Sequence, residues 1–141
     1  MRTIKFRGRH LCGQWYYGNL IVRETDSPVP ETPQAYKCVM IGEVEYGSEE
    51  EVEEETVGQF TGLLDKNNKE IYEGDFVKTK GGWGGIVLWN SRGYFYIKDS
   101  SLYKDEEPDL SPIGSLLCCE RNKLEIIGNI HDNPELLKGG E

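Results

Sequence analysis

Residues 58–78 have the sequence GQFTGLLDKNNKEIYEGDFVK, and residues 124–137 have the sequence LEIIGNIHDNPELL. In both stretches short apolar runs alternate with glycine, asparagine and aspartate, which are residues that favour turns. Asn67 and Asn68 tolerate the positive φ that a tight turn needs. These features predict short strands joined by tight turns.

The segment between these stretches extends the β pattern. Residues 86–89 (IVLW) and 94–97 (YFYI) are continuous β-branched and aromatic runs, joined by four residues, a common hairpin loop length. A glycine–aspartate turn ending at Asp75 precedes a strand that places Val77 and Thr79 on one face. The whole region therefore predicts a series of antiparallel strands.

The second stretch ends with a helix-start signal. Asn133 is a preferred N-cap residue, Pro134 suits the first helical position and Glu135 places an acid in the first turn. We expect a last strand at 124–130, followed by a short helix that ends at Leu137.

The first part of the chain also carries strand patterns. Residues 3–7 alternate in polarity, which places Ile4 and Phe6 on one face and Arg7 on the other. Residues 36–46 predict another strand.

The intervening residues predict turns and loops. Residues 14–23 are rich in β-forming side chains, with a turn expected at Gly18 and Asn19. Three prolines within residues 26–34 predict a loop. The acidic run at 47–55 repels itself and predicts a mobile loop or a solvated helical turn.

Many short strands at regular spacing predict an all-β fold, either a small barrel or a sandwich. The order of strands and turns favours an SH3-type β-barrel at residues 57–141, which includes the short C-terminal helix. Residues 1–56 then form a smaller N-terminal β element with an acidic loop. About 60 residues alone bury little surface, so we expect this element to complete its core against another structure.

Several motifs resemble those of the YopX family of phage and prophage proteins. They are IKFR at 4–7, the pattern QFTGL-DKN-K-IYEGD-V that begins at Gln59, GIVLW at 85–89 and EIIGNIHDNPELL at 125–137. The resemblance implies a phage or prophage origin and a β-rich fold with a C-terminal SH3-type barrel. It implies no assigned chemistry and supplies no catalytic residues.

The net charge of −9 is concentrated in one region. Eight glutamates lie between residues 43 and 55, where Lys and Arg are absent. Such a patch repels a nucleic-acid backbone, so direct nucleic-acid binding is disfavoured. The candidate acidic patch comprises Glu49, Glu50, Glu51, Glu53, Glu54 and Glu55.

Aromatic side chains supply a second candidate surface. If Phe95 and Ile97 point into the core, their neighbours on the same strand point outward, and Trp83 lies on a glycine-rich turn (GGWGG). Small barrels bind bases or proline-rich peptides through such faces, although these rings can equally pack beneath the N-terminal element. The candidate partner-binding face comprises Tyr72, Trp83, Trp89, Tyr94 and Tyr96.

We expect no catalytic centre, metal or cofactor. His10 and His131 have no visible catalytic partner, and no nucleophile motif is present. The glycine-rich turn lacks the Lys-Ser/Thr of a phosphate-binding loop. Asp65 and Asp75 are interpreted as turn caps. Zinc would require distant cysteines to converge, so we favour free, packed thiols for Cys12, Cys38, Cys118 and Cys119.

The sequence therefore favours a non-enzymatic module that binds another protein. Neither a secretory signal nor an apolar run of membrane-spanning length is visible, so we expect a bacterial cytosolic location. Self-association is a further expectation, because the cations at Arg2, Lys5, Arg7 and Arg9 can meet the acidic stretch of another subunit.

Two alternatives involve nucleic acid. The acidic patch can mimic nucleic acid and inhibit a host protein that has a basic groove. The aromatic face can bind single strands if cations line the same groove. The candidate cations are Lys78, Lys80, Arg92 and Lys98.

Overall fold

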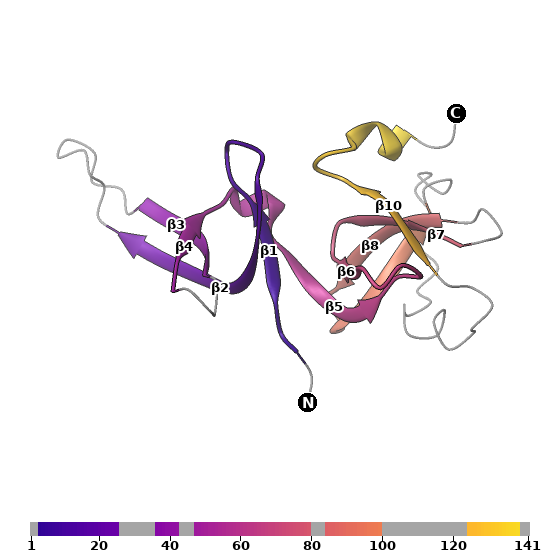
Figure 1. Cartoon of the computed structure of the whole chain (residues 1–141), viewed down its shortest axis with the longest axis horizontal. Coiled ribbons are helices and arrows are strands. Elements are labelled where there is room, and N and C mark those ends of the chain that lie inside the picture. The colour runs from indigo at the N-terminus through magenta and orange to yellow at the C-terminus, as the bar shows by residue number, and fades with distance from the viewer. Residues whose placement is uncertain (1–2, 26–35, 43–46, 80–83, 100–123, 139–141) are drawn as a thin grey trace. The chain divides into compact units, whose positions relative to one another are not determined.

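The computed structural model describes residues 3–25, 36–42, 47–79, 84–99 and 124–138, and these carry ten β-strands (Figure 1). The predicted loop at 26–34, Trp83, Lys80, Cys118 and Cys119 lie outside the described residues. The described part of the chain contains no helix that is long and apolar enough to cross a membrane. The prediction of a mainly β fold is confirmed.

The chain divides into two compact units, residues 1–59 and residues 60–141. The predicted boundary lay at residue 56, close to this division. Strand β5 (Gly58–Leu64) belongs to both units, because its first residues pair with β1 and its later residues pair with β6.

The first unit is an antiparallel sheet in which β4, β3, β2, β1 and β5 follow one another. A short 3-10 helix, η1, joins β4 to β5. The elements are β1 (Phe6–Arg9), β2 (Trp15–Thr25), β3 (Tyr36–Gly42), β4 (Glu49–Glu51) and η1 (Glu54–Thr56).

Strand β2 runs without interruption through the turn predicted at Gly18 and Asn19, so that prediction is wrong. Its first residues pair with β1, up to the Phe6–Gly18 pair. From the Asn19–Gly42 pair onward it pairs with β3. The two partners hold consecutive halves of β2, so hydrogen bonds from both sides keep the backbone extended where a turn was expected.

The acidic run is also more ordered than predicted. Residues 49–51 form β4, antiparallel to β3, so a loop is wrong there, whereas the helical-turn alternative holds for 54–56. The buried Val52 anchors the run in the core. Ion pairs to two arginines, described below, reduce the repulsion between the glutamates.

The core of the first unit is small. Val39, Ile41 and Val52 are buried, and Phe6, Tyr16, Leu20 and Val57 pack against them. Gly8 lies so close to Val52 that a Cβ at Gly8 would lie 2.6 Å from Val52 Cγ2. Ile4, predicted to share the buried face with Phe6, is 62% exposed because it precedes β1 and has no strand partner in the described ladder.

The second unit contains a four-stranded antiparallel sheet in the order β10-β7-β8-β9. Its core combines residues from β6 to β10 with Leu124. The elements are β6 (Glu70–Tyr72), β7 (Asp75–Lys78), β8 (Gly84–Asn90), β9 (Tyr94–Asp99), β10 (Glu125–Asn129) and the 3-10 helix η4 (Pro134–Lys138). The buried cluster comprises Ile71, Val77, Val87, Phe95, Ile97 and Leu124.

Two turn predictions in this unit are confirmed. Asn68 has a φ of 62°. The β8–β9 hairpin turns after the Asn90–Tyr94 pair, where Gly93 has a φ of 92° and Asn90 Oδ1 accepts the Arg92 N–H at 2.8 Å. The glycine-rich turn expected at 81–85 is wrong for Gly84 and Gly85, which begin β8, and residues 81–83 lie outside the described part of the chain. Val77 and Thr79, predicted to share one face of the strand, are both buried. The predicted terminal helix is a short 3-10 helix, and closure of these strands into an SH3-type barrel stays a prediction.

Candidate functional site

Tyr72, which was predicted to belong to the exposed aromatic face, is buried and only 2% exposed. Tyr72 lies opposite Phe60 in the β5–β6 ladder, and the two ring centroids are 5.5 Å apart. Its hydroxyl donates to Glu70 Oε2 at 2.8 Å. Cross-strand packing therefore buries a ring that the prediction placed at the surface.

The remaining described aromatics of that face lie on opposite sides of the sheet. Directly opposed residues of an antiparallel pair share a face, and successive residues alternate. Trp89 opposes Phe95, whereas Tyr96 opposes Leu88 and Tyr94 opposes Asn90. Trp89, 43% exposed, therefore shares the Phe95 side, with ring centroids 4.7 Å apart. The predicted residues do not form one binding surface.

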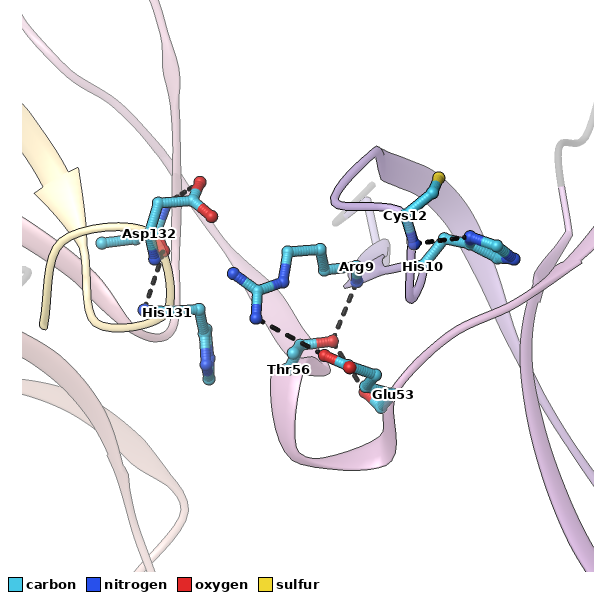
Figure 2. A network of polar contacts seen from close by, with 8 residues as sticks. Arg9, His10, Cys12, Glu53, Thr56, His131 and Asp132 are labelled. Atoms are coloured by element: carbon cyan, nitrogen blue, oxygen red, sulfur yellow. Dashed lines mark hydrogen bonds and ion pairs between the residues drawn. The ribbon is translucent and has the colours of Figure 1, made fainter.

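Ion pairs occupy part of the predicted acidic patch. The Arg23 guanidinium binds both carboxylate oxygens of Glu49, at 2.6 and 2.8 Å. Arg9 pairs with Glu53 at 3.4 Å (Figure 2). Mimicry of nucleic acid by the remaining glutamates stays a prediction.

The β1–η1 link is built around the buried Thr56. Its hydroxyl accepts the Arg9 backbone N–H at 2.8 Å and donates to the Glu53 carbonyl at 2.6 Å (Figure 2). The Glu53 N–H in turn donates to the Arg9 carbonyl at 2.9 Å. These bonds fix the acidic run against β1 within one chain, where the sequence suggested that such charges meet between subunits.

The histidines take part in local turns. The Cys12 N–H donates to His10 Nδ1 at 3.0 Å (Figure 2). The His131 N–H donates to Asn129 Oδ1 at 3.0 Å. Cys12 is a free, exposed thiol, which departs from the packed thiol expected there. Among the described residues, no group of three or more His, Cys, Asp or Glu side chains is arranged to hold a metal ion.

The register of the first sheet reveals a surface that the sequence analysis missed. Tyr17 opposes Arg7, and Ile21 opposes Met40, so these residues lie on one face of the sheet. The core residues, such as Tyr16 and Leu20, occupy the other face. We call this surface the Arg–Trp face, formed by Arg7, Trp15, Tyr17, Ile21 and Met40, with Arg23 and Glu49 at its rim.

The side chains of the Arg–Trp face are held in defined positions. The Arg7 guanidinium lies 4.7 Å from the centroid of the Trp15 ring, and Arg7 is only 6% exposed. Such cation–π contacts are worth about 0.5–2 kcal/mol. Tyr17 beside them is 46% exposed. At the rim, Arg23 Nη1 lies 3.9 Å from Met40 Sδ and also binds Glu49.

One sequence-based prediction concealed this face, because the turn expected at Gly18 would have separated Tyr17 from Ile21. Arg7 does lie on the side of β1 opposite Phe6, as predicted. Residues 15–23 show no clear alternation of apolar and polar side chains. The available signal was their richness in β-forming residues on both sides of Gly18 and Asn19, which is compatible with one long strand.

A protein-family model described as YopX protein matches residues 5–138. The chain belongs to the YopX family. Its fold is similar to the crystal structure of protein EF1440 from Enterococcus faecalis, with a TM-score of 0.54 and 22% sequence identity. That match covers 97% of this chain and 99% of the other. No curated protein matches the sequence.

The motifs that carry the YopX resemblance serve the fold. Asp65 is buried, and its Oδ1 accepts the N–H groups of Asn67 and Lys69 at 2.8 and 2.9 Å. Asp75 Oδ2 accepts the Tyr72 N–H at 2.8 Å. Both carboxylates hold turns, as predicted. These two YopX motifs therefore explain how the second unit folds. The motif IKFR at 4–7 lies in the first unit and contributes Arg7 to the Arg–Trp face.

Proposed function

We propose that this YopX-family chain is a non-enzymatic protein-binding module of phage or prophage origin that acts in the bacterial cytosol. We propose the Arg–Trp face as its binding surface. The observation that carries this proposal is its composition: Trp15, Tyr17, Met40 and Arg7 gather on one sheet face. Aromatic residues, Met and Arg are the types enriched in the cores of protein interfaces.

The geometry of the face also suits binding. Trp15 and Arg7 already hold each other, and the bidentate Arg23–Glu49 pair fixes the rim. Side chains that are ordered before association lose little conformational freedom when a partner binds. The exposed ring of Tyr17 then supplies apolar area at low entropic cost, which is typical of an interface hot spot.

The two nucleic-acid alternatives draw less support from the described residues. A mimic needs a series of available carboxylates, and both Glu49 and Glu53 are engaged by arginines. A single-strand binder needs its aromatic rings on one groove, and Trp89 lies on the opposite side of the sheet from Tyr94 and Tyr96.

The test is a quantitative comparison of two neighbouring surface substitutions. A partner captured from induced cells is purified, and its Kd for the chain is measured by calorimetry. Tyr17→Glu removes an exposed ring from the Arg–Trp face and should raise the Kd at least about 30-fold, or about 2 kcal/mol. Val22→Glu changes a 52% exposed residue whose side chain lies on the opposite face, and should leave the Kd within about twofold. Equal effects of the two substitutions would contradict the proposal.

A further inference from the structure

We infer that residues 3–5 form a strap that closes onto β2 as an extension of β1. In the structure the strap precedes β1, which begins at Phe6, and it lies outside the β1–β2 ladder. Closure concerns the chain alone and does not depend on the proposed function. It is supported by the register of the ladder, by an open side of β2 and by the exposure of Ile4.

The register of the ladder continues naturally into the strap. The pairing of β1 with β2 is unbroken up to its last pair, Phe6 with Gly18. In an antiparallel register, each step back along β1 is matched by one step forward along β2. Strand β2 continues beyond Gly18, and the strap continues the chain beyond Phe6. The same register assigns three further pairs, which are Lys5–Asn19, Ile4–Leu20 and Thr3–Ile21.

Strand β2 has an open side at these positions. In the strand order, β2 lies between β3 and β1. Strand β3 pairs with residues 19–25 of β2, whereas β1 pairs only with residues 15–18. Residues 19–21 therefore have no strand partner on the β1 side in the described ladders. Such a side presents N–H and C=O groups to another strand, and the strap is continuous with the strand that stops beside it.

The strap also carries an apolar side chain that closure would cover. Ile4 is 62% exposed. In the continued register Ile4 opposes Leu20, and it lies on the same face of the sheet as Phe6. Phe6 and Leu20 both pack against the core of the first unit. Closure therefore moves Ile4 from solvent to the margin of this core, and the loss of exposed apolar surface favours the closed state.

Opposing terms keep the strap in equilibrium between open and closed states. Closure orders the backbone of three residues, which costs conformational entropy. The compensating gains are the burial of one apolar side chain and a few backbone hydrogen bonds, each of modest net value in water. Because these terms are similar in size, small changes in the strap shift the balance.

Closure changes the Arg–Trp face as well. Lys5 alternates with Phe6, so it lies on the same side of the sheet as Arg7. In the closed state Lys5 opposes Asn19 and is a diagonal neighbour of Tyr17, within reach of a long side chain. Thr3 then lies opposite Ile21. The strap is thus a built-in device that gives the surface proposed for binding two states.

NMR spectroscopy of the full chain without a partner tests this inference. Directly opposed pairs alternate between hydrogen-bonded and closer, non-hydrogen-bonded kinds. One of the pairs Lys5–Asn19 and Ile4–Leu20 should therefore give a nuclear Overhauser contact between its two α protons. The backbone chemical shifts of residues 3–5 should lie toward strand values, and they report the closing constant, which is the ratio of closed to open chains.

Two substitutions of exposed apolar residues provide a matched comparison. Ile4→Asn removes the apolar side chain of the strap and should lower the closing constant at least about fivefold. Leu11→Asn changes an 81% exposed residue at the β1–β2 turn and should leave the closing constant within about twofold. Both positions are exposed, so both variants should keep the fold, which circular dichroism checks.

Two outcomes would overturn the inference. One is the absence of α-proton contacts for both pairs together with coil-like chemical shifts of residues 3–5. The other is an equal effect of Ile4→Asn and Leu11→Asn on those shifts. Neither outcome bears on the proposed function, because the measurement uses no partner and neither substitution lies on the Arg–Trp face.

Discussion

At the level of residues, the Asp65 carboxylate links a turn of the second unit to a distant strand by hydrogen bonds. Asp65 satisfies two N–H groups of its own turn through Oδ1, and its Oδ2 accepts the Ile126 N–H of β10 at 3.2 Å. The Lys66 N–H adds a backbone bond to the Leu124 carbonyl at 2.8 Å. One side chain thus ties the β5–β6 turn to a strand about 60 residues later, which explains an aspartate there without invoking a reaction.

Substitution of Asp65 by Ala should destabilise the protein substantially. It leaves three backbone donors without their carboxylate partner, and the expected loss in the free energy of unfolding is about 2–3 kcal/mol. Urea denaturation measures the loss. Asn67→Ala, an exposed residue of the same turn, serves as the control and should change the free energy by less than about 0.5 kcal/mol. Equal losses for the two variants would show that Asp65 is not the organiser of this turn.

Gly128 is required by close packing at the bulge in β10. The β10–β7 register shifts between Ile126 and Gly128, and a Cβ at Gly128 would collide with Asn133 Oδ1, the atom that accepts the Asn129 N–H. Gly128→Ala should therefore cost about 1–3 kcal/mol of stability by overpacking. The double variant Gly128→Ala/Asn133→Ala, compared with each single one by thermal unfolding, should cost less than the sum. Strict additivity would refute the clash.

At the level of elements, the sequence correctly predicted two turns whose conformation depends on their own residues. The hairpin at Asn90–Gly93 and the turn at Asn67–Asn68 depend on their own turn chemistry, and both formed as expected. Strand β4 could not be predicted in this way, because it depends on pairing with β3. The Arg–Trp face was missed for a related reason: it exists only because β2 stays extended between two different partners.

The link between η1 and β1 tests how the acidic run is held. Thr56→Val removes a buried hydroxyl that both accepts from Arg9 and donates to Glu53, and should lower the free energy of unfolding by about 2 kcal/mol. Thr56→Ser keeps the hydroxyl and should cost clearly less. Chemical denaturation of the two variants compares them directly, and a larger loss for the serine variant would argue that packing, rather than hydrogen bonding, holds η1.

At the level of the whole molecule, the two units differ in how much core they bury. The described core cluster of the first unit has three buried hydrophobic residues, against six in the second. A smaller buried apolar core opens at lower free energy. The unit that carries the Arg–Trp face is therefore expected to be the less stable one, which is consistent with a unit that gains stability on association.

Hydrogen exchange at low protein concentration checks this difference. Backbone amides of β3 should exchange faster than those of β8, because the first unit opens more readily. Addition of a purified partner that binds the Arg–Trp face should slow exchange in β2 and β3 by mass action, and should leave β8 unchanged. Equal protection of both units at low concentration would contradict the assignment of unequal stability.

The central claim is that the Arg–Trp face is the functional surface, and its most direct measurement is hydroxyl-radical footprinting of the chain with and without a purified partner. The account predicts that Tyr17 and Met40 lose reactivity together when the partner binds, while Val22 on the opposite face and Leu11 at the β1–β2 turn remain reactive. Protection of Val22 or Leu11 with Tyr17 and Met40 unchanged would contradict it.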